Sequence, residues 1–386
     1  MNIYSDLATT NLYPMSGHTP LTMKFVLPTS PAEVVSKSND QNILQQYIVK
    51  TPEQVSSQLP YMDPAIIDLQ RLSDSEEELQ KFKSLLSSWG AIQLVNHGIE
   101  NSTLDQVLQV TRQFFDLSLK EKEKYARYVS QNWKLDQMEG YGCDRMSEGQ
   151  AFNWCDRLFL VLHPESRRKP QYWPDESIPK FREIVDDYLN GLIRIREILL
   201  KSISKMLNLP EEYLISKYGN DGFIATRFNL YPTSPYPDRI LGSRRHTDIN
   251  LFTILLLDKE VEGLHVEKDE QWYIVPIVPN ALVFNIADML EIITNGSVKS
   301  PCHRVVTDAE RERLSIVSAF GPAPNSEIGP LEELIDEENP IRYPTLKNSS
   351  EVAADYFANG KIFIKEIRKF GAHILDQERE ELNKET

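Results

Sequence analysis

The fold is decided by one stretch of the chain, Arg244-Arg245-His246-Thr247-Asp248, together with the aliphatic run 249–256 that follows it. His246 and Asp248 stand two residues apart, beside a segment rich in β-branched and aliphatic side chains. Because side chains alternate between the two faces of a strand, a strand over 247–257 would place the imidazole and the carboxylate on one face. The spacing therefore predicts two metal ligands side by side.

A second histidine, His303, lies much later in the chain, at the start of another strand-like segment over 303–306. Two imidazoles and one carboxylate on one face of a metal leave the opposite face open, which is the arrangement of non-haem Fe(II) oxygenases. Zinc also accepts histidine and carboxylate ligands. His246, Asp248 and His303 are therefore candidate metal ligands, and taken alone they leave iron and zinc both open.

Arg313 and Ser315 again stand two residues apart, on the segment that follows. An arginine fork and a hydroxyl on one strand face suit a buried carboxylate, because the guanidinium donates two parallel hydrogen bonds and the serine adds a third. A small dicarboxylate would then chelate the metal at one end and bind Arg313 at the other. A zinc hydrolase needs no such anchor, so this pair favours iron.

These motifs resemble those of the plant 2-oxoglutarate- and Fe(II)-dependent dioxygenases, a group that includes flavonoid, gibberellin and alkaloid oxygenases. The likeness covers roughly residues 60 to 325, and several independent motifs occur in the same order. The matching segments are Ile66-Ile67-Asp68-Leu69, Trp89-Gly90, Asn96-His97-Gly98, Asn229-Leu230-Tyr231-Pro232, His246-Thr247-Asp248, Leu251 to Leu257, Gly263-Leu264, Trp272, Ser300 to Val306 and Glu312 to Ser315.

The resemblance implies cofactors and roles for individual residues. Fe(II) would be bound by the two histidines and the aspartate, and ascorbate would keep the iron reduced. The far carboxylate of 2-oxoglutarate would bind Arg313 and Ser315, with Tyr231 hydrogen-bonding that carboxylate and Asn229 meeting the iron-chelating end. The expected products are succinate, CO2 and a substrate that has been hydroxylated, O-demethylated, desaturated or ring-closed.

Two alternatives to this activity stay open. One is an ascorbate-driven oxidase of the same fold, since relatives of that kind keep an Arg-x-Ser. The other is a non-oxidative small-molecule binder or cyclase, which would survive His246→Ala and the chelation of iron. Sequence leaves the substrate itself open, beyond a small, largely apolar metabolite of plant specialised metabolism.

The residues that line the substrate pocket are expected to be mainly aromatic, since aromatic rings suit a flat, largely apolar molecule. One of the arginines directly before His246 would favour an acidic or polar substituent if it faced the pocket mouth. The substrate candidates are Tyr141, Phe152, Trp154, Arg245, Phe320 and Phe357.

Periodicity predicts helices in the first half of the chain and short, regularly spaced strands after it. Helical apolar spacing covers 180–207 and 352–378, and strand-like segments occur over 223–231, 264–266, 272–275, 281–286 and 314–320. This pattern is typical of an α+β protein with a mostly β, jelly-roll core, and the resemblance implies its double-stranded β-helix form. The expected divisions are a partly disordered leader (1–58), an N-terminal α/β region (59–215), the jelly-roll core (216–322) and a C-terminal helical segment that covers the site (323–386).

Composition narrows the partners. A formal net charge of −15 in 386 residues argues against nucleic acid and anionic membrane surfaces, both of which attract clustered Lys and Arg. No apolar span approaches the length of a membrane helix, and three cysteines are too few for a disulfide framework. We expect a cytoplasmic protein that acts as a monomer on a small molecule and O2.

Overall fold

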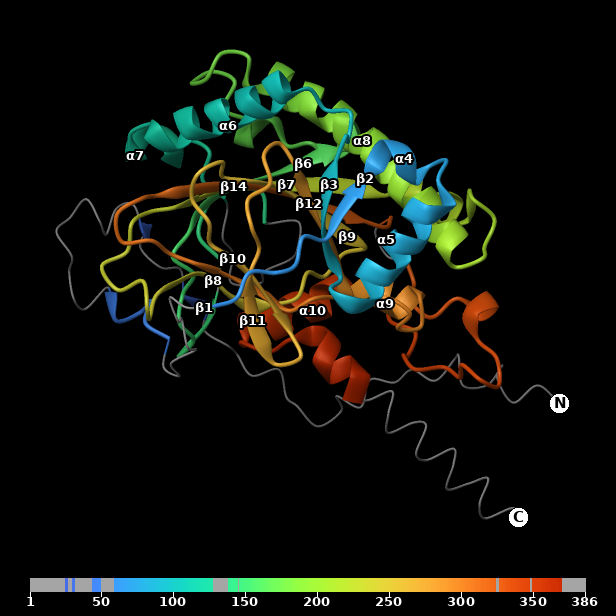
Figure 1. Ribbon diagram of the computed structural model, residues 1–386. Helices are drawn as coiled ribbons and strands as arrows, with labels where there is room; N and C mark the ends of the chain where they lie inside the picture. The colour runs from blue at the N-terminus through green and yellow to red at the C-terminus, as the bar shows by residue number, and fades with distance from the viewer. Residues whose placement is uncertain are drawn as a thin grey trace.

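Two sheets of mainly antiparallel strands lie face to face at the centre of the molecule (Figure 1). The computed structural model describes residues 25–26, 30–31, 44–49, 59–127, 138–144, 146–323, 326–347 and 349–369. The larger sheet has eight strands in the order β2-β3-β12-β9-β14-β7-β6-β4, and the smaller has four in the order β11-β10-β13-β8. All neighbours pair antiparallel except β2 and β3, which are parallel.

The strands carry branched and aromatic side chains, which favour a pleated, buried surface. Those of the larger sheet are β2 (Ile66–Asp68), β3 (Ala91–Val95), β4 (Gly140–Gly142), β6 (Asp156–His163), β7 (Phe223–Tyr231), β9 (Phe252–Leu257), β12 (Leu282–Ile286) and β14 (Arg313–Gly321). Those of the smaller sheet are β8 (Leu241–His246), β10 (Leu264–Lys268), β11 (Gln271–Ile274) and β13 (His303–Val306). A separate pair joins β1 (Phe25–Val26) to β5 (Met146–Ser147).

Helices cover the outer face of the larger sheet (Figure 1). The longest, α8, buries one stripe of its surface, as its apolar spacing predicts. Helix α5 begins where Ser75 Oγ accepts a hydrogen bond from the Glu78 amide, behind an acidic first turn. The α-helices are α4 (Leu69–Leu72), α5 (Glu76–Ser88), α6 (Asn101–Asp116), α7 (Leu119–Glu123), α8 (Phe181–Met206), α9 (Asp288–Ile293) and α10 (Ser349–Ala358). Single turns lie at η2 (Glu165–Arg167), η3 (Pro170–Tyr172), η4 (Ile215–Gly219) and η5 (Glu332–Leu334).

The expected strand over 247–257 is wrong in its first half. Strand β8 ends at His246, the chain then turns, and β9 begins only at Phe252. The turn is held by backbone bonds to α9, since the Asp288 and Met289 amides donate to the carbonyls of Asp248 and Ile249. Neither β8 nor α9 was predicted, because β8 is polar in sequence and α9 is too short to show a helical period.

The C-terminal segment also differs from the prediction of one long helix over 352–378. Helix α10 ends at Ala358, and residues 363–369 form a separate helical turn. Gly360 lies between them with φ +73°, a conformation that glycine adopts without steric cost. The part of the prediction beyond residue 369 falls outside the described residues.

One continuous hydrophobic core joins the N-terminal helices to both sheets, running from α5, α6 and α8 to β9, β12 and β14. The boundaries expected at residues 59, 216 and 323 therefore stay predictions. Most of the 1–58 leader lies outside the described residues, as does the expected disorder there. Within the described chain, no helix combines the length and apolar character needed to cross a membrane.

Candidate active site

The two histidines meet because β8 and β13 are neighbours in the smaller sheet. His303 pairs directly across from His246 in the β-ladder, and their ring centroids are 4.3 Å apart. Asp248, on the turn after β8, places Oδ1 3.7 Å from His246 Nε2 and 3.6 Å from His303 Nε2. One ligand atom from each residue lies within 4.8 Å of the others, so the three side chains converge as metal ligands do.

Hydrogen bonds fix the orientation of each ligand. His246 Nδ1 lies 2.7 Å from the Arg244 carbonyl oxygen, and His303 Nδ1 lies 3.1 Å from that of Pro301. A carbonyl only accepts, so each Nδ1 carries the proton and each Nε2 lone pair faces Asp248. Thr253 donates to Asp248 Oδ2 at 2.6 Å, which leaves Oδ1 toward the histidines.

The charges of this cluster suit a divalent metal. Burial, followed by the neighbouring His303, lowers the pKa of His246 to about 4, so the ring is neutral at physiological pH. Burial alone would raise the pKa of Asp248, but the two histidines and Thr253 outweigh it and lower that pKa. Two neutral imidazoles and one carboxylate are the donor set that Fe(II) takes in oxygenases.

A second group of predicted residues meets where β7 and β14 pair. Arg313 lies opposite Tyr231 and Ser315 opposite Asn229. The Ser315 hydroxyl is 3.3 Å from the Tyr231 hydroxyl and accepts from Asn229 Nδ2 at 3.2 Å. All four side chains are buried on one face of the larger sheet.

Arg313 supplies the test of whether this group fits a carboxylate. Its Nε donates to the Val261 carbonyl at 3.2 Å, but its buried Nη1 has no hydrogen-bond partner in the described chain. Burial lowers the pKa of Arg313, and the neighbouring Tyr231 and Asp258 oppose this shift without cancelling it. An unpaired buried guanidinium nitrogen is costly, and a carboxylate between Arg313, Tyr231 and Ser315 would satisfy it.

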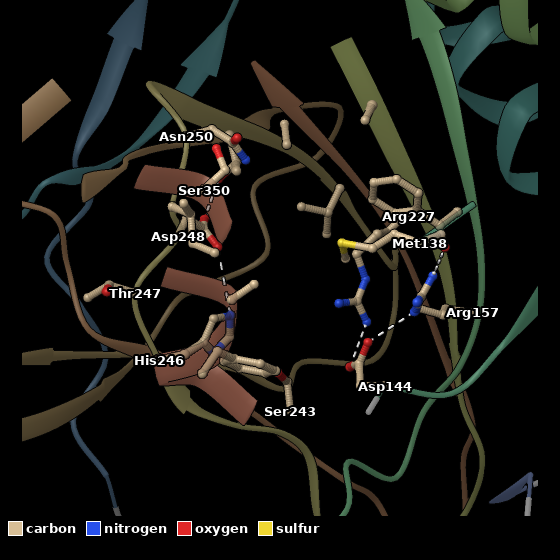
Figure 2. Close-up of a pocket in the computed structure, with 18 of the residues that line it drawn as sticks. Met138, Asp144, Arg157, Arg227, Ser243, His246, Thr247, Asp248, Asn250 and Ser350 are labelled. Atoms are coloured by element: carbon tan, nitrogen blue, oxygen red, sulfur yellow. Dashed lines mark hydrogen bonds and ion pairs between the residues drawn. The ribbon is translucent and has the colours of Figure 1, made fainter. Parts of the chain in front are cut away.

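A cavity of about 210 Å³ opens beside the metal candidates (Figure 2). His246 and Asp248 form part of its wall, and the opposite side holds Asp144, Arg157 and Arg227. Helix α10 contributes Phe357, whose ring meets the His246 ring edge-on with centroids 5.6 Å apart. The volume suits a small molecule, most of whose surface would be enclosed.

Of the six substrate candidates, Phe357 is the one among the lining residues of this cavity in the described chain. Tyr141 instead packs against Phe114 in the core, with ring centroids 5.8 Å apart, and Phe320 stacks on Phe252 at 4.6 Å. Both are apolar strand residues buried on the side that faces other hydrophobic rings. The prediction that Tyr141 and Phe320 line the substrate pocket is therefore wrong.

Phe152 and Trp154 also lie outside the lining. Both pack on Tyr47 in a small cluster of their own, and the Trp154 indole donates to the Pro232 carbonyl at 3.1 Å. Arg245 points away from the cavity, because both of its ion-pair bonds, at 2.6 and 2.7 Å, go to the Glu267 carboxylate on β10. The preceding residue, Arg244, donates a hydrogen bond to the Phe357 carbonyl at 3.0 Å and so contacts a residue that lines the cavity.

The residues missed in the sequence are Thr253, Asp144, Arg157 and Arg227. One of them left a signal. Arg227 stands two residues before Asn229 on a correctly predicted strand, so alternation alone places it on the same face as Asn229 and Tyr231. Asp144 and Arg157 are brought to the site by the pairing of β4 with β6 and of β6 with β7, whereas Thr253 reaches Asp248 from five residues along the chain.

The comparisons with known proteins agree with this geometry. Residues 211–322 match the family model of the 2OG-Fe(II) oxygenase superfamily, and residues 65–176 match that of the non-haem dioxygenase in morphine synthesis N-terminal region. The chain is 34% identical to Protein SRG1 of Arabidopsis thaliana, over 78% of this chain and 85% of the relative. It is 35% identical to codeine O-demethylase of Papaver somniferum, over 72% and 77% of the two chains.

Among solved structures, the chain resembles JOX2 in complex with 2OG, Fe and JA. The TM-score is 0.78 at 30% identity, and the match covers 88% of this chain and 98% of JOX2. The expected α+β, double-stranded β-helix fold is thus confirmed, as is the expected class of enzyme. This chain belongs to the 2-oxoglutarate- and Fe(II)-dependent oxygenases of the plant specialised-metabolism type.

Proposed function

We propose that this enzyme oxidises a small, largely apolar metabolite at one C–H position, with 2-oxoglutarate converted to succinate and CO2. Hydroxylation is the basic outcome, and O-demethylation, desaturation or ring closure follow from where the oxidised carbon lies. The proposal is supported by the cavity, which is walled by Phe159, Phe223, Val317 and Phe357 and borders the metal candidates. The printed names of codeine O-demethylase and of the JOX2 complex point to two different molecules, so the substrate is argued below from this chain's own residues.

His246, Asp248 and His303 would hold Fe(II) in this proposal. Their contribution is a rigid set of three donors: two Nε2 lone pairs fixed by Nδ1 bonds to carbonyls, and one carboxylate oxygen fixed by Thr253. Bound Fe(II) with 2-oxoglutarate and O2 supplies an oxidant strong enough to remove hydrogen from an unactivated carbon.

Arg313, Ser315, Tyr231 and Asn229 would bind 2-oxoglutarate. The unpaired Nη1 of Arg313 carries the proposal, because a buried guanidinium with an open donor calls for an anion at that place. Tyr231 and Ser315 add hydroxyls to the far carboxylate. Asn229, two ladder positions along β7 from Tyr231, would meet the chelating end.

The cavity walls would place the target carbon and exclude water. Phe357 does both, since its ring covers His246 while its backbone is tied to Arg244. Ascorbate would serve as a reductant for the iron. We further infer a cytoplasmic monomer; the three buried, unbridged cysteines of the described chain support a reducing compartment.

The test is an aerobic incubation of the full chain with Fe(II), ascorbate, 2-oxoglutarate and a library of small plant metabolites, following succinate and substrate mass together. The expected result is succinate in step with a substrate that gains one oxygen, or loses a methylene or two hydrogens. Conversion without succinate would instead favour the ascorbate-driven oxidase or a non-oxidative cyclase, and metal dependence separates these two. Conversion that survives His246→Ala and iron chelation would establish a non-oxidative cyclase.

A further inference from the structure

A charged cluster lies in the wall of the cavity across from the metal candidates (Figure 2). Arg157 Nε donates to Asp144 Oδ1 at 3.0 Å, and Arg227 Nη2 donates to Asp144 Oδ2 at 3.1 Å. Arg157 is 1% exposed and belongs to β6, whereas the Arg227 side chain is 26% exposed and belongs to β7. The rest of the wall combines apolar side chains with neutral polar groups such as Ser243 and Asn250, and this cluster adds partly buried charge that a bound substrate would meet.

Asp144 already accepts hydrogen bonds from three donors and offers little to a cationic ligand. Both of its oxygens are taken by the two arginines, and Asn153 Nδ2 adds a third donor at 2.9 Å. Burial alone would raise the pKa of Asp144, but Arg227, Arg157 and Asn153 lower it well below the usual range. The carboxylate is therefore a fixed counter-ion for the arginines, and an amine would find no partner in it.

The positive charge of Arg157 and Arg227 together exceeds the negative charge of Asp144. Two guanidinium groups against one carboxylate leave a positive charge in a partly dehydrated wall. Arg127 also lines the cavity and adds to the positive potential at Asp144. The other carboxylate in the lining apart from Asp248 is Asp355, which is exposed on α10 and screened by water.

Arg227 has a donor to offer. Its Nε bonds Asn229 Oδ1 at 3.3 Å and its Nη2 bonds Asp144, while Nη1 makes no hydrogen bond to the described residues. Because Asp144 and Asn229 hold the fork from two sides, the guanidinium is already oriented before a ligand arrives. Such preorganisation reduces the entropy lost on binding.

We propose that the substrate is a carboxylic acid, and that Arg227 binds its carboxylate while the apolar body extends toward His246 and Asp248. The inference rests on the oxygenase function proposed above and narrows its substrate class. It places the acid group at the opposite end of the cavity from the metal, so the oxidised carbon is remote from the carboxylate. An amine or a neutral molecule of the same shape binds less well.

Binding measured without turnover tests this directly. The full chain is loaded with Mn(II), which does not support the oxidation, and with saturating 2-oxoglutarate, so that probes meet only the cavity. The probes are 3-phenylpropanoate, 4-phenylbutanoate and octanoate, each with its primary amide and the corresponding amine, titrated by calorimetry. We expect the acids to bind roughly tenfold or more tightly than the amides, since hydrogen bonds between charged partners are the stronger ones.

Three variants make the result specific. Arg227→Gln should erase the preference for acid over amide, and Arg227→Lys should restore part of it. Arg245 lies one residue from His246, but its guanidinium is paired with Glu267. Arg245→Gln should therefore keep the full preference for acid over amide. Arg227 also contacts Asn229, so 2-oxoglutarate is titrated into each variant. Each variant must still be saturated by 2-oxoglutarate under the conditions of the probe titrations.

Several outcomes overturn the proposal: amides binding as tightly as acids throughout the set, amines binding more tightly, no acid binding at all, or an acid preference that survives Arg227→Gln. Each is independent of the oxygenase function, because the titration needs neither O2 nor product. Loss of succinate formation in the incubation described above would contradict the reaction and leave the acid-binding result standing.

Discussion

At the scale of single residues, the site depends on side chains whose orientation is fixed by hydrogen bonds. Each metal-facing histidine uses Nδ1 on a backbone carbonyl, and Asp248 uses Oδ2 on Thr253, so one atom of each side chain remains for the metal. Arg313 shows the converse, a buried donor whose partner must come from a ligand. Burying these polar groups costs free energy, and a bound metal and a bound carboxylate would offset that cost.

Asp248→Ala removes the one anionic donor among the proposed metal ligands. We expect the affinity for Mn(II) to fall by at least about tenfold and turnover to be lost, because the two neutral imidazoles cannot balance the metal charge. Metal titration and succinate formation measure the two effects. The exposed Asp238→Ala serves as control and should match the wild type; ordinary activity in Asp248→Ala would refute the assignment of the metal ligands.

Arg313→Gln should weaken 2-oxoglutarate binding without changing metal affinity. Loss of a charged, buried fork costs roughly 2–5 kcal/mol, which corresponds to a KM for 2-oxoglutarate raised at least about thirtyfold. The matched control is Arg311→Gln, an exposed arginine two residues earlier in the loop before β14. An unchanged KM in Arg313→Gln would refute the assignment of Arg313 as the anchor of the 2-oxoglutarate carboxylate.

At the scale of elements, the C-terminal segment closes the cavity, and one of its attachments is to a buried carboxylate. Glu291 of α9 is fully buried and accepts two bonds of 2.6 Å from Arg368, in the 363–369 turn. Tyr343 donates to the same carboxylate at 2.6 Å. This attachment holds α10, and with it Phe357, over the metal candidates.

Arg368→Ala should loosen that attachment. Removing one partner of a buried ion pair costs several kcal/mol, and we reduce this to roughly 1–3 kcal/mol because about a third of the Arg368 side chain is exposed. Hydrogen exchange over 349–369 should quicken, and the substrate KM should rise while 2-oxoglutarate affinity stays. Lys369→Ala, whose pair with Glu366 lies on the surface, is the control; equal exchange in both variants would count against the attachment.

At the scale of the whole molecule, buried histidines make stability depend on pH. Burial, with Arg304 nearby, lowers the pKa of His265 to about 4, against an ordinary value near 6.5. Between these values the unfolded chain binds more protons than the folded one. The contribution of His265 is therefore complete above about pH 6.5 and is lost as the pH falls toward 4.

This predicts that the free energy of unfolding of the metal-free protein falls between about pH 6.5 and about pH 4. Urea denaturation at several pH values in that range measures it. In His265→Gln the decline should be smaller, because one of the buried rings that must be neutral is gone. A decline of the same size in both proteins would show that His265 does not contribute.

The sequence by itself determined the metal candidates, the carboxylate anchor and the class of fold. Those conclusions rest on local patterns: two-residue alternation on β7 and β14, and motifs in a fixed order. Alternation places Asn229 with Tyr231 and Arg313 with Ser315 whatever the rest of the chain does. The strand over 303–306 and the strand over 223–231 were predictable for the same reason.

Only the tertiary structure decided which side chains surround the substrate. Asp144 follows β4, and it meets Arg157 and Arg227 through the pairing of β4 with β6 and of β6 with β7. Helix α10 reaches His246 from more than a hundred residues away along the chain. Tyr141 and Phe320 have the same apolar character as Phe357, yet they pack into the core. An aromatic side chain packs equally well against other rings and against a ligand, so its residue type does not show which of the two it contacts. Long-range packing alone decides this.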